Sequence, residues 1–119
     1  MDIVLASQEY DLRLALEMLF REEPGAAVVG TASESEGLLA LIQSTHPDLV
    51  LLDCDLPGRP AVEVLAQIKS TDRPPKVILL GKDDDDEEAA LVAGADVFLV
   101  KGDPPGQLLA ATREVSAQS

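Results

Sequence analysis

The amino-acid sequence predicts an α/β fold, a doubly wound sheet of five parallel strands with helices on both faces. Five short apolar runs recur along the chain, and Gly, Pro or charged residues bound each of them. Helical patterns lie between the runs in strict alternation. Continuous apolar runs of this length are typical of strands covered on both faces, and strict alternation predicts right-handed crossovers in a parallel sheet.

The five apolar runs are the predicted strands. They lie at residues 3–6, 27–29, 49–52, 77–80 and 97–100. A five-unit arrangement of this kind favours the flavodoxin-like strand order 2-1-3-4-5.

The intervening segments are the predicted helices. Apolar residues recur at helical spacing within residues 12–20, 38–42, 62–68, 89–93 and 108–115. Breakers follow the first four helices at Pro24-Gly25, Pro47, Pro74-Pro75 and Gly94. Before the fifth helix, we expect Asp103 to be the N-cap and Pro104 or Pro105 to stand in the first turn.

The composition fits one domain, residues 1–119, with an aliphatic core. Hydrophobic residues make up 46% of the 119 residues and aromatic residues only 3%. The formal charge of −13 argues against direct binding of nucleic acid or of anionic membrane by this domain. The sequence has no apolar run long enough to span a membrane, and it has a single cysteine, Cys54. Its first residues lack the basic start and long apolar core of a signal peptide, so we expect a cytoplasmic location.

Residues 83–88 form a run of six acids. The simplest interpretation is a solvated loop that also supplies negative charge to the first turn of the fourth helix, where the helix dipole favours it.

In open α/β sheets the functional site lies beyond the carboxyl ends of the strands. Asp53, Cys54 and Asp55 follow the third predicted strand, and Lys101 follows the fifth. From the residues alone, two interpretations are equally well supported. In the first, Asp53 and Lys101 form a structural salt bridge. In the second, Asp53 is a nucleophilic carboxylate that accepts a phosphoryl group, and Lys101 supplies positive charge.

The segments PDLVLLDCDLPG (residues 47–58), KVILL (residues 76–80) and AGADVFLVK (residues 93–101) resemble the CheY-like receiver domain of two-component response regulators. VVGTASESEGLLAL (residues 28–41) also matches in spacing, so the resemblance covers essentially the whole chain. It implies a non-enzymatic signalling domain that acts in a phosphorelay.

The resemblance also implies roles for individual residues. Asp53 matches the phosphoacceptor, Lys101 the lysine that pairs with the phosphoryl group, and Phe98 the aromatic switch position. Asp55 occupies the position whose backbone carbonyl binds Mg²⁺, so Asp53 and Asp55 are the remaining candidates for a metal site.

The sequence departs from the family pattern in two features, the acidic pair and the switch hydroxyl. Ser7 and Gln8 stand where the family has an acidic pair that holds the metal, and their neutral oxygens are poor substitutes because Mg²⁺ prefers charged oxygen ligands. Gly81 stands where the family has a Ser or Thr whose hydroxyl couples phosphorylation to the switch. We therefore expect weak Mg²⁺ binding or none, and phosphorylation of Asp53 that is slow and weakly coupled to conformation, or absent.

The resemblance and its departures leave three functions open. The first is a receiver that still accepts phosphate from a histidine kinase or another signalling protein and controls an attached or partner output domain, transcriptional by analogy. The second is a phosphate-independent interaction module, with a homodimer contact through the fourth helix, fifth strand and fifth helix. The third is a small-molecule sensor built on the same fold.

Overall fold

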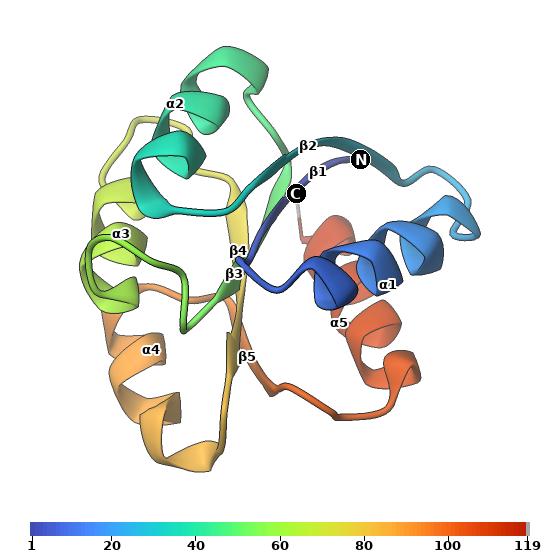
Figure 1. The fold of residues 1–119 in the computed structure, drawn as a ribbon. Helices are drawn as coiled ribbons and strands as arrows, with labels where there is room; N and C mark the ends of the chain where they lie inside the picture. The colour runs from blue at the N-terminus through green and yellow to red at the C-terminus, as the bar shows by residue number, and fades with distance from the viewer. Residues whose placement is uncertain (119) are drawn as a thin grey trace.

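In the computed structural model, which describes residues 1–118, the predicted strands form one parallel sheet (Figure 1). The strands are β1 (Asp2–Ala6), β2 (Ala27–Ala32), β3 (Leu49–Asp53), β4 (Lys76–Gly81) and β5 (Val97–Val100). Their order is β2-β1-β3-β4-β5 and every pairing is parallel, so the flavodoxin-like prediction is confirmed. The central strand, β3, is buried along its whole length.

Helices cover both faces of the sheet, as Figure 1 shows. They are α1 (Tyr10–Arg21), α2 (Ser35–Thr45), α3 (Ala61–Lys69), α4 (Glu87–Ala93) and α5 (Pro105–Ala117), with a short 3₁₀ turn, η1 (Asp84–Asp86), before α4. Helices α1 and α5 lie on one face, and α2, α3 and α4 lie on the other. None of the helices within residues 1–118 has the length and apolar character needed to cross a bilayer.

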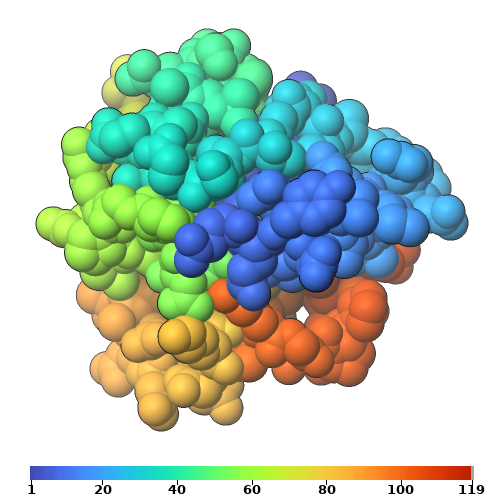
Figure 2. Space-filling view, viewed as in Figure 1, coloured from blue at the N-terminus to red at the C-terminus, as the bar shows by residue number. Residues whose placement is uncertain are grey.

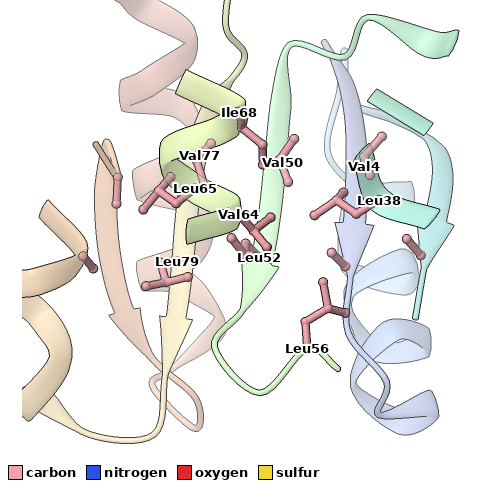
Figure 3. Packing of buried hydrophobic residues seen from close by; sticks show 14 of the residues in the cluster. Val4, Leu38, Val50, Leu52, Leu56, Val64, Leu65, Ile68, Val77 and Leu79 are labelled. Atoms are coloured by element: carbon pink, nitrogen blue, oxygen red, sulfur yellow. The ribbon is translucent and has the colours of Figure 1, made fainter. Parts of the chain in front are cut away.

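The sheet divides the aliphatic core into two layers because successive strand side chains point to opposite faces. In β3, Val50 and Leu52 pack with Leu65 and other residues of α2, α3 and α4 (Figure 3). The alternate residues Leu49 and Leu51 pack toward α1 and α5. The low aromatic content is therefore matched by Leu, Val, Ile and Ala packing on both sides.

The start of α5 differs from the prediction. Pro104, not Asp103, is the N-cap residue, and Pro105 is the first residue of the helix. The Asp103 carboxylate instead accepts a hydrogen bond of 3.0 Å from the backbone N–H of Val100. This bond and a turn with Gly102 at φ 92° hold the side chain back against the end of β5.

The acidic run is exposed, as predicted, although part of it is ordered into η1. The Asp83 carboxylate accepts a 2.9 Å hydrogen bond from the backbone N–H of Asp85. Glu87 and Glu88 occupy the first turn of α4, where they complement the helix dipole.

Candidate functional site

Three strand ends bring Ser7, Asp53 and Lys101 together at the carboxyl edge of the sheet. Each lies two residues beyond a strand residue that packs toward α1 and α5, so all three continue the side-chain alternation of that face. Those strand residues are Leu5 in β1, Leu51 in β3 and Leu99 in β5. Asp53 is itself the last residue of β3, because the strand extends one residue beyond the predicted end at residue 52.

Asp53 is a fully buried carboxylate, with 0% of its surface exposed. Its Oδ1 lies 2.6 Å from Lys101 Nζ and accepts a 2.9 Å hydrogen bond from the backbone N–H of Asp55. Its Oδ2 accepts a 2.7 Å hydrogen bond from Ser7 Oγ. Burial disfavours the charged form, but these three donors outweigh it and hold the pKa of Asp53 below its ordinary value.

The Lys101 ammonium is shared by three carboxylates. Besides Asp53, its Nζ lies 2.9 Å from Glu9 Oε2 and 3.1 Å from Asp55 Oδ2. Burial disfavours the charged ammonium, yet the bonds to these carboxylates raise the pKa of Lys101 above its ordinary value. Lys101 therefore stays charged and fixed among the acids at the sheet edge.

Ser7 and Gln8 act as hydrogen-bond donors in this cluster. Ser7 is buried, and its Oγ donates to Asp53 while accepting a 3.0 Å bond from the backbone N–H of Glu9. Gln8 Nε2 lies 3.4 Å from the backbone oxygen of Asp55, a long and exposed hydrogen bond. The side chains that follow β1 thus present protons to Asp53 and to the Asp55 carbonyl, where an acidic pair would present negative oxygens.

Gly81, the last residue of β4, makes space for the ring of Phe98. A Cβ placed on Gly81 would overlap that ring, with Cε2 only 2.7 Å away. Phe98 is 9% exposed and packs in the core layer beneath α2, α3 and α4. The ring therefore occupies the room that a serine or threonine side chain at position 81 would need.

The sequence prediction of the site missed three contacts. Glu9 binds Lys101, a contact that the sequence did not predict. Arg13 Nη1 donates a 2.6 Å hydrogen bond to the Ser7 carbonyl, and Lys82 Nζ lies 3.5 Å from Asp55 Oδ1. Arg13 lies one turn into α1 and Lys82 directly after β4, so only their position relative to the strand ends could have indicated these contacts.

Cys54 is a partly buried thiol within the cluster. Burial, followed by the charge of Asp55, raises the pKa of this thiol. Cys54, Asp53 and Asp55 each offer one potential metal-ligand atom, and these atoms lie within 4.8 Å of one another. These three residues therefore form a cluster of potential metal ligands at this edge of the sheet, with two carboxylates and one thiol.

Sequence comparison places this fold and site in a family. Residues 3–113 match the response regulator receiver domain. The nitrate/nitrite response regulator protein NarL of Escherichia coli is 32% identical over 117 residues, which cover 97% of this chain and 54% of NarL. The transcriptional regulatory protein AfsQ1 of Streptomyces coelicolor is 35% identical over 100 residues, or 83% of this chain and 44% of AfsQ1.

Among solved structures, a two-component response regulator of the LuxR family from Aurantimonas superposes with a TM-score of 0.91 at 26% identity. The match covers 98% of this chain and 85% of that one. The chain spans about half the length of the curated relatives named above. The match over residues 3–113 and the agreement in fold show that this chain belongs to the response regulator receiver domain family.

Proposed function

We propose that this receiver domain is an atypical signal-input module, in which Asp53 is the phosphoacceptor by descent but reacts slowly and with little help from Mg²⁺. The module controls an attached or partner output domain, and the name of AfsQ1, a transcriptional regulatory protein, favours a transcriptional output. The observation that carries the proposal is the set of donors around Asp53: Ser7, Lys101 and the backbone N–H of Asp55 occupy both carboxylate oxygens.

The chemistry open to Asp53 is nucleophilic attack on phosphorus. A carboxylate oxygen forms a bond to the phosphorus of a phosphodonor, the bond from phosphorus to the leaving group breaks, and an acyl phosphate results. Attack weakens the hydrogen bonds to the attacking oxygen, from Ser7 Oγ at Oδ2 or from Lys101 Nζ at Oδ1, because the ester oxygen that forms is a poorer acceptor than a carboxylate oxygen. Hydrogen bonds to charged groups contribute about 1.5–3 kcal/mol each, so weakening them slows the reaction.

The residues at the site are a poor match for Mg²⁺, which prefers several hard oxygen ligands in octahedral geometry. Within residues 1–118, the cluster of potential metal ligands consists of Asp53, Cys54 and Asp55. Only two of these are carboxylates, and the Cys54 thiol is a soft ligand that suits other metals better than Mg²⁺. Both carboxylates already bind lysine ammonium groups, and the Asp55 carbonyl accepts from Gln8. The Lys101 ammonium therefore already provides positive charge at the position where a bound metal ion would add it.

Coupling to the switch is also weakened. Gly81 has no hydroxyl that could bind a phosphoryl group on Asp53, and the space above it is filled by the Phe98 ring. This arrangement favours a second candidate function, an interaction module that works without phosphate. Its contact face would include α4, where Leu91 and Val92 are 45% and 82% exposed.

The test is the reaction with acetyl phosphate, with and without Mg²⁺, followed by intact mass spectrometry. We expect slow labelling of the native chain that Mg²⁺ accelerates little, and no labelling of Asp53→Asn. A metal stabilises a transition state by several kcal/mol, so Gln8→Asp should restore Mg²⁺-dependent labelling and accelerate it by about tenfold or more.

Gln8→Asn is the matched control, because it has the size of aspartate without the charge, and it should behave like the native chain. Rapid, stoichiometric and Mg²⁺-dependent labelling of the native chain would contradict the proposal. If Gln8→Asp is labelled and the native chain is not, the phosphate-independent module is the better description.

A further inference from the structure

A cavity lies on the α1–α5 side of the sheet, next to the carboxylate cluster, with which it shares Lys101. Its volume is about 460 Å³, within the range of roughly 300–1,000 Å³ that is common for small-molecule sites. The segment that joins β5 to α5 swings away from the sheet before α5 begins, and Figure 2 shows the surface open between this segment and α1. The cavity is therefore accessible from solvent.

The walls of the cavity are mainly apolar. Leucines contribute from α1, from the ends of β4 and β5 and from α5: Leu12, Leu16, Leu19, Leu80, Leu99 and Leu108. The remaining walls include small or rigid residues, among them Ala15, Gly102 and Pro104, which line the space without filling it. A ligand with an apolar body would bury these surfaces.

Three charged residues border the cavity, and their partners decide which charge a ligand should carry. The Lys101 ammonium is held by three carboxylates, and the Asp103 carboxylate is held by the backbone N–H of Val100. Glu22, which follows α1, is exposed and has no ion-pair partner within residues 1–118. The cavity therefore offers an available negative charge, on a chain whose net charge is −13.

The length of the cavity limits the ligand. Leu12 and Glu22, which both line it, are ten residues apart. At 1.5 Å per residue this is roughly 15 Å along the helix axis. Leu19, which also lines the cavity, lies within one turn of Glu22, so a ligand bound at the free carboxylate can extend along an apolar wall of about this length.

We propose that this cavity binds a small amphipathic amine, whose apolar body lies against the leucines of α1 and whose cationic group pairs with Glu22. The site is distinct from Asp53, and its occupation does not require phosphorylation. Lys101 and Leu80 border both the cavity and the carboxylate cluster, so a bound ligand and the state of Asp53 influence each other reciprocally.

The experiment compares two probes of equal chain length, octyltrimethylammonium and octyl sulfate, each below its micelle concentration. Binding to the full 119-residue chain is measured by calorimetry, and the site is located from methyl NMR shifts. We expect the cationic probe to bind about tenfold more tightly than the anionic one, with shifts confined to the leucines of the cavity.

Two substitutions test the location of the site. Ala15 is exposed on α1, so Ala15→Trp should fill the cavity without disturbing the core, and should weaken binding about tenfold or more. Ala40→Trp, at an exposed position of α2 on the other face, is the matched control and should leave binding unchanged. If Ala15→Trp does not give a native circular dichroism spectrum, Ala15→Leu replaces it, with the same expected direction.

The charge is tested with Glu22→Gln, which should weaken binding of the cationic probe about threefold, whereas Glu63→Gln on α3 should not. Several results would overturn the proposal: no binding of either probe, equal affinity for both, or full binding to the folded Ala15 variant. It would also be overturned if sedimentation showed a native dimer that Ala15→Trp converts to a monomer, because a second copy would then cover these walls. None of these readouts depends on labelling of Asp53, so this proposal and the proposed function can fail separately.

Discussion

At the residue scale, Asp53 shows how a buried carboxylate remains charged. The residue is fully buried, which by itself would favour the neutral acid. Donors from β1, from the loop after β3 and from the end of β5 stabilise the negative charge instead. The same donors that make Asp53 a stable anion make it a less reactive nucleophile, because attack weakens the hydrogen bonds to the attacking oxygen.

The first prediction concerns the pH dependence of stability. The pKa of Asp53 is lowered in the folded chain, so its charged form stabilises the fold above the unfolded pKa of about 3.9, and this contribution is lost as the pH falls through the lower folded value. We therefore expect the free energy of unfolding, measured in urea, to be higher for the native chain than for Asp53→Asn. This difference should become smaller below about pH 4.

The control for this prediction is Asp72→Asn, which changes an exposed acid. The difference in unfolding free energy between the native chain and Asp72→Asn should stay nearly constant over the same pH range. A difference for Asp53→Asn that is equally flat would show that Asp53 does not stabilise the fold through its charge.

Only some of the contacts at the site could be predicted from the sequence. The strand pattern located Asp53 and Lys101 at one edge of the sheet, because strand ends are visible as the ends of apolar runs. The bond from Lys101 to Glu9 joins residues 92 positions apart, and it depends on how the start of α1 sits over the end of β5. Nothing in the local sequence of either residue determines that geometry.

At the element scale, the pairing of β4 with β5 sets the relation between Gly81 and Phe98. Phe98 lies opposite Leu79, and Gly81 lies opposite Val100, so the ring and the glycine are diagonal neighbours across the two strands. Diagonal neighbours are within reach of aromatic side chains. The ring therefore leans over the glycine and stays in the core.

The second prediction is an energetic coupling between these two positions. Gly81→Ser should destabilise the fold by about 1–3 kcal/mol, because the new side chain overlaps the Phe98 ring. Phe98→Ala should cost about 3–5 kcal/mol, the usual range for a buried Phe. In the double variant the serine meets no ring, so urea unfolding should show a cost clearly below the sum. Additive costs would mean that the ring and position 81 do not interact.

The third prediction concerns Asp96, which joins α3 to β4 and to the start of β5. Its Oδ2 accepts hydrogen bonds of 2.8 Å from Lys69 Nζ and of 2.8 Å from the backbone N–H of Val77. Asp96→Ala removes both hydrogen bonds and leaves the Val77 N–H without this acceptor, while Lys69 keeps its 3.0 Å bond to the Pro75 carbonyl, and it should lower the unfolding free energy by about 1–3 kcal/mol. Asp96→Asn keeps an acceptor for Val77 and should cost less. Equal costs for the two variants would contradict this account.

The elements themselves were largely predictable, because strands that are covered on both faces are apolar throughout and Pro or Gly follows each of the first four helices within a few residues. The exception at the start of α5 is instructive. Asp103 has the right identity and position for an N-cap, but the turn at Gly102 lets its carboxylate reach the backbone N–H of Val100 instead. Capping by Asp depends on the backbone turn before the helix as well as on residue type.

At the scale of the whole molecule, the excess of acids acts on every association that the chain makes. The charge of −13 is spread over a small body, whose radius of gyration is 12.7 Å, and residues 83–88 concentrate six acids beside the end of β4. Self-repulsion of this kind destabilises a compact state and slows the approach of anionic molecules, and salt screens both effects.

The fourth prediction is that salt raises both the stability and the reactivity of the chain. Adding NaCl to about 0.15 M shortens the screening length to about 8 Å, so the melting temperature and the labelling rate with acetyl phosphate should both increase. Replacing Asp83, Asp84, Asp85 and Asp86 with Asn should make both the salt-dependent rise in melting temperature and the salt-dependent rise in labelling rate smaller. A melting temperature that falls with salt would show that attractive ion pairs, such as those of Lys101, outweigh the repulsion.

The Phe98 ring above Gly81 also constrains the order in which mutations could give the chain a switch hydroxyl. Serine at position 81 alone arrives in a space that is already filled, so the first step on that path is unfavourable. Either the ring turns aside to admit the serine, or a smaller residue at position 98 comes first, at the cost of a cavity in the core. On either path the first variant is less stable than the present chain.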